Sequence, residues 1–392
     1  MERRAFVVVL DACGCGALPD AADYGDAGTN TLAHVADAVG GLRVPTLERL
    51  GLGCITEIRG VAPAGRPVVH GRLAALGAGK DTTAGHWELM GLPSPRLPTY
   101  PQGFPPELID ALRRATGRGA ICNAPAEGLR AIEEYGGRHL VSGELILYTS
   151  QDSVFQLAAH TAVVPEAELY EYCAAARSIL TGEHAVGRVI ARPFEGEPGS
   201  FRRTAGRRDF SLEPPGRTYL DELSDAGVEV HSVGKVAQVF AGRGIAVDHR
   251  APDNRSAIAA IDRLLDEAGA GLVFANLVDT DQVYGHRKDV HGFHRALQEI
   301  DSTVARWVAR LRPGDLLCLC ADHGCDPAHP GTDHTREHAP LLAVYAGHDG
   351  RRADGWLADV GATALQWLTG RRADLPGEPF APAPAVAAET TS

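Results

Sequence analysis

Residues 315–338 read Asp315-Leu316-Leu317-Cys318-Leu319-Cys320-Ala321-Asp322-His323-Gly324-Cys325-Asp326-Pro327-Ala328-His329-Pro330-Gly331-Thr332-Asp333-His334-Thr335-Arg336-Glu337-His338. The first five residues predict a buried strand, because four of them are apolar. A carboxylate and an imidazole follow at Asp322 and His323, and His334 lies beyond a turn rich in glycine and proline. Carboxylates and imidazoles on a loop after a buried strand are typical of a metal site, and ligands of open α/β sheets bind at this edge. The stretch therefore predicts a metal site whose other ligands come from elsewhere in the chain.

Two more apolar runs predict strands of the same sheet, and each is followed by carboxylates. Residues 5–10 lead into Asp11, and residues 272–277 lead into Asp279 and Asp281. Strands separated by helical patterns indicate a doubly wound, mostly parallel α/β sheet, in which the ends of neighbouring strands lie along one edge. The carboxylates could therefore converge, although Asp11 taken alone could equally cap a helix or form a turn.

Length and composition bound the kind of protein. The chain has 392 residues, of which 44% are hydrophobic and 22% charged, which predicts two or three domains with sizeable cores. The formal net charge of −12 argues against nucleic acid and anionic membranes as partners. Small anionic substrates remain possible, because bound cations can reverse the local field. No obligate protein partner is evident.

Signals for export or membrane insertion are absent from the sequence as given. The apolar run at 5–10 stops at Asp11, which is too short for a secretory leader, and no run approaches the roughly 20 residues of a membrane span. The eight cysteines show no CxxC spacing, and the pairs at 13/15 and 318/320 are interpreted as small buried hydrophobes rather than a thiol site. We expect a cytoplasmic protein with reduced thiols.

A glycine-rich lead-in precedes Thr82 and a helical pattern. This order predicts that the Thr82 hydroxyl lies at a helix N-terminus, where backbone N–H groups and the helix dipole favour anions. Gly79-Lys80 is similar to the end of a phosphate-binding loop, but the glycine required six positions before Lys80 is missing. The plainer alternative is that Thr82 and Thr83 only cap the helix.

Two segments rich in proline and glycine predict crossings between domains. The first holds six prolines in residues 93–106, and the second precedes residue 217. We therefore predict an inserted α+β domain at 92–216 and a discontinuous core domain at 1–91 and 217–392. The end of the core domain, residues 371–392, is rich in Pro and Ala and is predicted to be a disordered tail.

Three carboxylates and three imidazoles follow the predicted strands of this sheet. They are Asp11, Asp281, Asp322, His286, His323 and His334. This set is too large for one structural zinc and suits two ions of the zinc or manganese type. Two divalent ions would leave the site net positive, attract a phosphate and stabilise an in-line phosphoryl transfer. Thr82 fits an alcohol nucleophile at such a site, whereas His329 and His338 are interpreted as polar loop residues.

These motifs together resemble the phosphopentomutase (phosphodeoxyribomutase) family, two-metal enzymes of the alkaline phosphatase superfamily. The resemblance runs from about residue 3 to residue 370. It rests on Asp11, Gly79-Lys80-Asp81-Thr82, Gly85-His86-Trp87-Glu88, Thr149-Ser150-Gln151-Asp152-Ser153, the run from Asp281 to His286, Ala321-Asp322-His323-Gly324 and Thr332-Asp333-His334-Thr335. It implies an alkaline-phosphatase-like core with the insertion as a cap domain.

The resemblance also implies two Mn²⁺ ions per chain. One would be held by Asp281, His286 and His334. The other would be held by Asp11, Asp322 and His323. Thr82 would contact both ions and carry the phosphoryl group. The residues that would face the sugar phosphate are Ser150, Asp152, Arg192 and Lys235. A sugar bisphosphate, glucose 1,6-bisphosphate or ribose 1,5-bisphosphate, would act as activator.

The implied reaction interconverts ribose 1-phosphate and ribose 5-phosphate, and the 2-deoxyribose pair, and so links nucleoside breakdown to pentose phosphate metabolism. Cap closure would exclude water from the phosphothreonine. The alternatives are a cofactor-independent phosphoglycerate mutase, a metal-dependent phosphomonoesterase of the same superfamily, and a non-catalytic metal-binding module. Two departures from the family pattern are Ala84, where many relatives carry a second hydroxyl residue, and the run at 123–128, which lacks a lysine after its asparagine.

Overall fold

The computed structural model describes residues 3–150 and 153–383. The chain divides into two compact units, one made of Met1–Arg96 and Pro214–Ser392 and the other of Leu97–Glu213. Both divisions fall in the proline-rich and glycine-rich segments singled out in the sequence. Each unit has its own sheet and its own packed helices.

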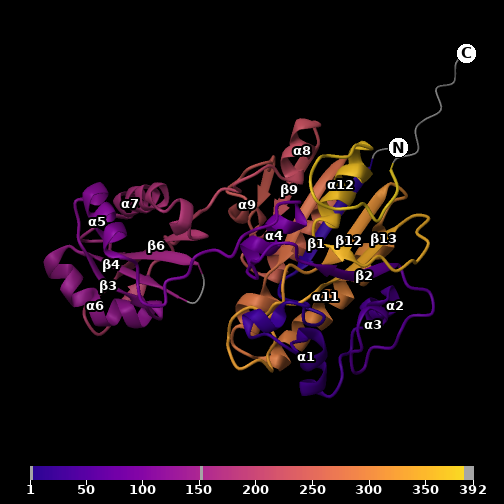
Figure 1. The fold of residues 1–392 in the computed structure, drawn as a ribbon, viewed down its shortest axis with the longest axis horizontal. Helices are drawn as coiled ribbons and strands as arrows, with labels where there is room; N and C mark the ends of the chain where they lie inside the picture. Colours follow the sequence, from indigo (N-terminus) through magenta and orange to yellow (C-terminus); the bar gives the residue numbers. More distant parts are fainter. Residues whose placement is uncertain (1–2, 151–152, 384–392) are drawn as a thin grey trace, which may run out of the picture. The chain divides into compact units, whose positions relative to one another are not determined.

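The first unit is built on an eight-stranded, mostly parallel sheet (Figure 1). Its strand order is β10-β9-β11-β1-β12-β13-β2-β14. The parallel strands are β10 (Val247–His249), β9 (Glu229–Val233), β11 (Gly271–Leu277), β1 (Arg4–Leu10) and β12 (Asp315–Cys320). The sheet continues antiparallel through β13 (Ala339–Tyr345) and β2 (Val69–Ala74) and ends at β14 (Gly355–Trp356). The predicted α/β class with a mostly parallel core sheet is confirmed.

The register of the three central strands brings their ends together. Every residue of β1, β11 and β12 is buried, as expected for strands that are covered on both faces. Leu10 of β1 pairs with Leu277 of β11, and Val9 pairs with Cys320 of β12. The segments that follow these strands therefore leave the sheet at the same edge, where Asp11 lies.

Two groups of helices pack around this sheet (Figure 1). The helices of one group contact α11 (Val290–Arg310) and are α1 (Thr31–Val39), α2 (Pro45–Leu50) and α10 (Asn254–Glu267). Those of the other contact α12 (Asp359–Thr369) and are α4 (Thr82–Leu89) and α8 (Tyr219–Asp225), with α9 (Val236–Val239) against α4. The shorter elements are η1 (Ala21–Tyr24), α3 (Leu52–Ile55) and the π-helical turn η3 (Thr280–Gly285).

The second unit contains a six-stranded sheet of its own. Its strands are β3 (Ala120–Pro125), β4 (Leu145–Thr149), β5 (Val154–His160), β6 (Arg188–Glu195), β7 (Arg202–Arg203) and β8 (Arg208–Ser211). Its helices are α5 (Pro106–Thr116), α6 (Gly128–Ser142), α7 (Glu166–Ile179) and the short η2 (Gly182–His184). Leu145 and Leu147 of β4 enter one core cluster, and Ile146 and Tyr148 enter another. Because alternate residues of a strand point to opposite faces, both faces of this sheet are packed.

The C-terminal segment differs from the predicted disorder over residues 371–383. Phe380 is buried, its backbone N–H donates to Oγ1 of Thr363 at 3.0 Å, and Nε2 of Gln366 donates to the carbonyl of Ala381 at 2.9 Å. The Pro- and Ala-rich composition did not indicate that Phe380 would be buried or that the backbone of this segment would form hydrogen bonds with side chains of α12. The prediction of disorder is therefore wrong for residues 371–383, and residues 384–392 lie outside the described residues.

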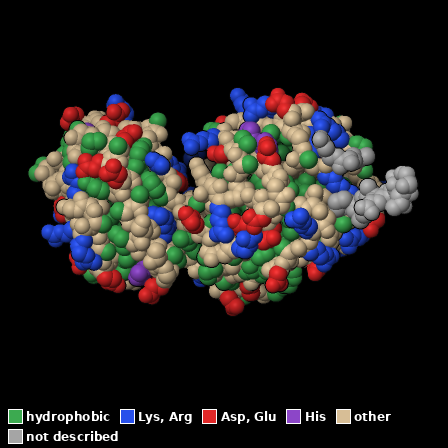
Figure 2. Space-filling view, turned by 90° about the horizontal axis from the view of Figure 1, so that it is seen from above, with side chains coloured by type: hydrophobic (Ala, Val, Ile, Leu, Met, Phe, Trp, Pro, Cys, Tyr) green, Lys and Arg blue, Asp and Glu red, His purple; other side chains and the backbone are tan. Residues whose placement is uncertain are grey.

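Acidic and basic side chains are interspersed on the face shown in Figure 2. The net charge of −12 is therefore not gathered into one acidic patch on this face. Among the helices in the described part of the chain, none is long and apolar enough to cross a membrane.

Candidate metal centre

Loops at one edge of the first sheet carry the predicted ligands. Asp11 follows β1 directly, and Asp322 and His323 follow β12. After β11 the chain enters η3, which carries Asp281 and is followed directly by His286. Such π-helical turns are rare and are found mostly at functional sites. The strand register thus brings residues that are far apart in sequence to the same edge of the sheet.

Asp281, His286 and His334 form the first group of possible metal ligands. Oδ1 of Asp281 lies 3.4 Å from Nε2 of His286 and 3.3 Å from Nε2 of His334. Nδ1 of His286 donates to the carbonyl of Thr332 at 2.7 Å, which leaves the Nε2 lone pair available to a cation. One ligand atom from each of the three side chains lies within 4.8 Å of the other two. The geometry is that of a group able to hold one ion.

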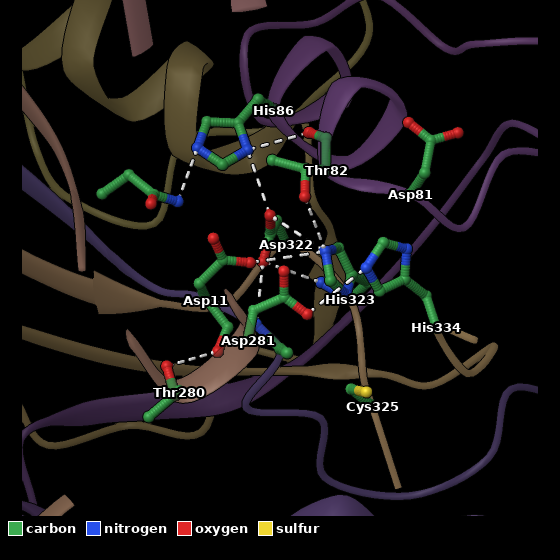
Figure 3. A network of polar contacts seen from close by, with 12 residues as sticks. Asp11, Asp81, Thr82, His86, Thr280, Asp281, Asp322, His323, Cys325 and His334 are labelled. Atoms are coloured by element: carbon green, nitrogen blue, oxygen red, sulfur yellow. Dashed lines mark hydrogen bonds and ion pairs between the residues drawn. The ribbon is translucent and has the colours of Figure 1, made fainter. Parts of the chain in front are cut away.

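Asp11, Asp322 and His323 form the second group, and all three are buried. Nε2 of His323 lies 3.4 Å from Oδ1 of Asp11 and 3.4 Å from Oδ2 of Asp322. Nδ1 of His323 faces the carbonyl of Gly324 at 3.1 Å, so that Nε2 again presents its lone pair to the carboxylates. The ring centroids of His323 and His334 are 4.0 Å apart, and the two groups therefore adjoin (Figure 3).

The carboxylate oxygens of both groups fit a cation. Within the described residues, Oδ1 of Asp11 and Oδ1 of Asp281 are buried and accept no hydrogen bond. Burying such an oxygen without a donor or an opposite charge costs free energy. Burial, followed by the nearby carboxylate of Asp322, raises the pKa of Asp11. Divalent cations would pair with the buried oxygens and would favour the charged form of Asp11. The donor set, which mixes nitrogen and oxygen ligands, therefore suits two such ions.

Lys235 lies between the two groups. Its Nζ donates to Oδ2 of Asp11 at 2.9 Å and lies 3.9 Å from Oδ2 of Asp281. The lysine comes from the turn between β9 and α9, at the same edge of the sheet. Asp11 therefore presents one oxygen to Lys235 and the other to His323. The resemblance assigns Lys235 to the sugar phosphate, and the structure places it against the carboxylates of the metal-type groups.

Thr82 is the first residue of α4, as predicted, but it does not cap the helix. The cap is Asp81, whose Oδ1 accepts hydrogen bonds from the N–H groups of Thr83 at 2.9 Å and Ala84 at 3.1 Å. The hydroxyl of Thr82 is thereby left for other contacts and lies 3.2 Å from Nε2 of His323 (Figure 3). The alternative in which Thr82 serves only as a cap is excluded by this geometry.

Sequence patterns assigned no role to His86 and Asn276, which are both buried. Nδ1 of His86 lies 2.9 Å from the carbonyl oxygen of Thr82 and 3.1 Å from Oδ2 of Asp322. Nε2 of His86 accepts a hydrogen bond from Nδ2 of Asn276 at 3.1 Å, which places the imidazole proton on Nδ1. His86 therefore joins the helix of Thr82 to a possible metal ligand. A polar residue within the apolar run of β11 is the one signal that could have found Asn276.

Gly85 allows α4 to approach the loop of the second group. A Cβ at this position would lie 2.4 Å from the carbonyl oxygen of Asp322, which is shorter than any real carbon contact. The helix that carries Thr82 and His86 can therefore pack directly on the backbone of a possible ligand only because residue 85 has no side chain.

The remaining predicted substrate residues belong to the second unit. Arg192 is half-buried on β6 and donates from Nε to Oε1 of Gln156 at 3.2 Å, and burial lowers the pKa of Arg192 to about 10. Ser150 follows β4, and Asp152 lies outside the described residues. Their assignment to the sugar phosphate stays a prediction.

The two departures from the family pattern have structural settings. Ala84 is buried, and a side chain on the facing Gly79 would clash with it. Asn123 bonds both backbone groups of Phe104, through Oδ1 at 2.8 Å and Nδ2 at 2.9 Å. Asn123 thus closes a loop within the second unit.

His329 and His338, interpreted from sequence as polar loop residues, both contact backbone carbonyls. His329 lies 3.0 Å from the carbonyl of Gly25 through Nε2, and His338 lies 3.1 Å from that of Gly16 through Nδ1. Neither histidine belongs to the two ligand groups.

Comparison with known proteins places this fold and centre in a class. A family model described as the Metalloenzyme superfamily matches residues 3–370. The PH0037 protein from Pyrococcus horikoshii has a similar fold, with a TM-score of 0.50 and 12% identity, over 95% of this chain and 99% of that chain. A Leishmania mexicana phosphoglycerate mutase gives a TM-score of 0.50 and 14% identity, over 97% of each chain. The class is that of the Metalloenzyme superfamily.

Closer relatives narrow the class to a family. A phosphopentomutase from Caldanaerobacter subterraneus subsp. tengcongensis is 51% identical over 348 residues, which cover 88% of each chain. A phosphopentomutase from Anaeromyxobacter sp. (strain K) is 50% identical over 383 residues, which cover 96% of this chain and 97% of the relative. The chain belongs to the phosphopentomutase family and is an enzyme, an intramolecular phosphotransferase.

Proposed function

We propose that the enzyme interconverts ribose 1-phosphate and ribose 5-phosphate, together with the 2-deoxyribose pair, through a phosphothreonine at Thr82 and two Mn²⁺ ions. The observation that carries this proposal is the position of the Thr82 hydroxyl, 3.2 Å from Nε2 of His323 in the second ligand group. Membership of the phosphopentomutase family supports the reaction class.

The two ions would be held by the two ligand groups and would supply positive charge that stabilises a transferring phosphoryl group. The carboxylate and imidazole ligands suit Mn²⁺. Thr82 sits at the N-terminus of α4, where the helix dipole favours the negative charge of a phosphoester. Asp81 caps the helix and keeps the hydroxyl of Thr82 free of the backbone.

The proposed cycle begins with the phosphoryl group on Thr82. The group passes to the free hydroxyl of a bound pentose monophosphate, which gives a pentose bisphosphate and restores the threonine hydroxyl. The other phosphate then returns to Thr82, which leaves the isomeric monophosphate. A sugar bisphosphate, such as glucose 1,6-bisphosphate or ribose 1,5-bisphosphate, would phosphorylate Thr82 that has lost its phosphate.

Partners and compartment complete the proposal. The proposed binding partners are pentose phosphates, and the protein binds no nucleic acid, no membrane and no obligate protein partner. The net charge of −12 argues against nucleic acid and anionic membranes. We place the reaction in the cytoplasm, because all eight cysteines are free thiols, as in proteins of reducing compartments.

The test is an assay on ribose 1-phosphate with Mn²⁺, with and without a sugar bisphosphate, in which ribose 5-phosphate and free phosphate are both measured. We expect ribose 5-phosphate to form faster with the bisphosphate and little free phosphate. Free phosphate released as fast as ribose 5-phosphate would identify a phosphomonoesterase. Turnover of 3-phosphoglycerate in place of the pentose would identify a phosphoglycerate mutase, and no turnover of any substrate would favour a non-catalytic module.

A further inference from the structure

The side chain of Lys80 is engaged within the first unit. Lys80 lies in the glycine-rich loop (residues 77–81) that leads into α4. Its Nζ donates to Oδ2 of Asp26 at 3.0 Å and lies 3.6 Å from Oδ2 of Asp333, and the side chain is only 15% exposed. Separating an ammonium from a buried carboxylate costs free energy, so Lys80 is poorly placed to bind a substrate phosphate.

Asp26 ties two loops together through one carboxylate. Its side chain is 1% exposed, and Oδ2 accepts from Nζ of Lys80 at 3.0 Å and from the backbone N–H of Arg336 at 2.8 Å. Arg336 belongs to the ligand loop (residues 321–338), which carries His334 two residues earlier. The carboxylate of Asp26 therefore joins the glycine-rich loop to the ligand loop.

Arg336 holds the same glycine-rich loop from its side chain. The guanidinium is buried, and its Nη1 donates to the carbonyl of Gly79 at 2.8 Å. The same guanidinium also pairs with Asp20, because its Nη2 donates to Oδ2 of Asp20 at 2.9 Å. The guanidinium carbon lies 5.0 Å from the ring centroid of Tyr24, whose hydroxyl donates to the carbonyl of Ala78 at 2.9 Å. Three consecutive residues, 78 to 80, are thus each held by a separate contact.

We propose that Asp20, Tyr24, Asp26 and Arg336, which we call the loop clamp, position Thr82 against the ligand groups. In this proposal Lys80 acts on its own loop through Asp26 and does not bind the substrate phosphate. The proposal rests on the proposed role of Thr82 as the phosphorylated residue. The members of the clamp are positioning residues, because none of them contacts Thr82 or a ligand side chain directly among the described contacts.

The clamp answers a physical need of this loop. Gly77 and Gly79 give the backbone before Thr82 many accessible conformations in the absence of other contacts. A displacement of a reacting group by about 1 Å can reduce a rate by about a hundredfold. Because the clamp joins this loop to the loop of His334, the hydroxyl and one ligand group keep a fixed spacing.

The first experiment separates a clamp from a phosphate ligand with Lys80→Met, Asp26→Asn and the double variant in the Mn²⁺-loaded enzyme. If Lys80 acts through Asp26, each single variant lowers kcat by about tenfold to a hundredfold and leaves KM within about threefold. The double variant is then no worse than the poorer single variant, because both changes remove one interaction.

A phosphate-binding Lys80 predicts the opposite pattern. Lys80→Met would raise KM for ribose 1-phosphate while kcat changed little, and Asp26→Asn would leave KM unchanged or lower it because the ammonium becomes available. Effects of the two substitutions that simply add would also overturn the proposal.

The second experiment tests Arg336 by the rate at which Thr82 is phosphorylated at a saturating concentration of glucose 1,6-bisphosphate. Arg336→Met is expected to slow this rate by at least about tenfold, and Arg336→Lys, which keeps a cation and a donor, to recover part of it. Mn²⁺ affinity measured by titration calorimetry should stay within about threefold of the original value, because no ligand is removed.

Arg310→Met is the matched control. Arg310 also forms a paired guanidinium, with Nη1 2.6 Å from Oδ1 of Asp262, but it lies at the end of α11. This control should leave the phosphorylation rate unchanged.

An unphosphorylated Thr82 in the original enzyme would refute the proposed function itself. If Thr82 is phosphorylated in Arg336→Met and in Lys80→Met as fast as in the original enzyme, only the clamp is refuted. If Arg336→Met does not fold, the Lys80 and Asp26 variants still decide.

Discussion

The hydroxyl oxygen of Thr82 lies 3.2 Å from Nε2 of His323, although 241 positions separate the two residues in the chain. Thr82 begins α4, and His323 follows β12. The contact exists because Gly85 lets the helix pack on the backbone of Asp322. A hydroxyl at this distance from a ligand nitrogen can approach an ion held by that ligand.

Replacing Thr82 by Ala should lower mutase activity by at least about a thousandfold, because the proposed acceptor of the phosphoryl group is gone. Thr82→Ser should retain measurable activity, since serine keeps the hydroxyl. Mass spectrometry of the protein after incubation with glucose 1,6-bisphosphate should find phosphate on Thr82 in the original enzyme.

Thr83→Ala provides the control for Thr82. Thr83 is the next residue of α4, and Asp81 bonds its backbone N–H rather than its hydroxyl. This variant should keep its activity within about threefold. A Thr82→Ala enzyme with full activity would rule out the phosphothreonine scheme.

Asn276→Leu should weaken Mn²⁺ binding by about tenfold to a hundredfold, although Asn276 is not a ligand. The amide of Asn276 donates to Nε2 of His86 and so keeps the imidazole proton on Nδ1, next to Asp322. Without that donor the imidazole can adopt the other tautomer and no longer orient the carboxylate. Titration calorimetry with Mn²⁺ measures the effect directly.

His70→Asn serves as the comparison for Asn276→Leu. His70 on β2 is also buried, and its Nδ1 lies 2.9 Å from the carbonyl of Val68, which precedes the strand, but His70 belongs to neither ligand group. Its loss should lower the melting temperature and leave Mn²⁺ affinity within about threefold. Equal Mn²⁺ affinity in Asn276→Leu and the original enzyme would show that the tautomer of His86 does not matter.

The sequence predicted the ligands that a simple rule of topology brings together. Asp11, Asp281 and Asp322 each follow a buried strand, and parallel strands place their ends along one edge. His86 and Asn276 were missed because their roles depend on packing between α4 and β11, which no spacing in the sequence encodes.

The tail shows a different limit of sequence reasoning. Its composition indicated disorder, but residues 371–383 are ordered by the burial of Phe380 and by backbone hydrogen bonds to α12. Composition gives the fraction of apolar residues, but it cannot show that one aromatic side chain is buried or that side chains of α12 form hydrogen bonds with the backbone of the tail.

Gly85→Ala should lower the activity of the enzyme, although Gly→Ala inside a helix usually raises stability. In an open helix interior, Gly→Ala stabilises by about 0.5–1 kcal/mol. Here the added Cβ would lie 2.4 Å from the carbonyl oxygen of Asp322, so α4 must move away from the second ligand group. We expect lower kcat and weaker Mn²⁺ binding, measured by steady-state kinetics and titration calorimetry.

Gly137→Ala is the control for this substitution. Gly137 lies within α6 of the second unit, where an added Cβ would have no heavy atom within 4 Å. The control should raise the free energy of unfolding by about 0.5–1 kcal/mol without affecting activity. If Gly85→Ala keeps its activity and Mn²⁺ affinity as Gly137→Ala does, the close packing of α4 on Asp322 is not required for either property.

Acid should weaken the second unit through His139. This histidine is buried, its Nδ1 donates to the carbonyl of Glu144 at 2.6 Å, and its Nε2 accepts from the backbone N–H of His160 at 2.9 Å. A proton on Nε2 would remove that acceptor. Burial lowers the pKa of His139 in the folded protein, and the nearby His160 and Arg118 act in the same direction, whereas the Glu144 carbonyl opposes them.

The sign of the pH effect follows from this depressed pKa. Below about pH 6.5 the unfolded chain binds a proton at His139 that the folded chain does not bind, so the stability of the second unit should fall as the pH falls from there. Hydrogen exchange at the His160 amide, compared at pH 7 and pH 5 after correction for intrinsic rates, reports this locally and avoids the titration of the metal ligands. His139→Leu should be less protected at pH 7, because the amide of His160 loses its acceptor, but its protection should change less between the two pH values. The same change in both proteins would assign the acid sensitivity to another group.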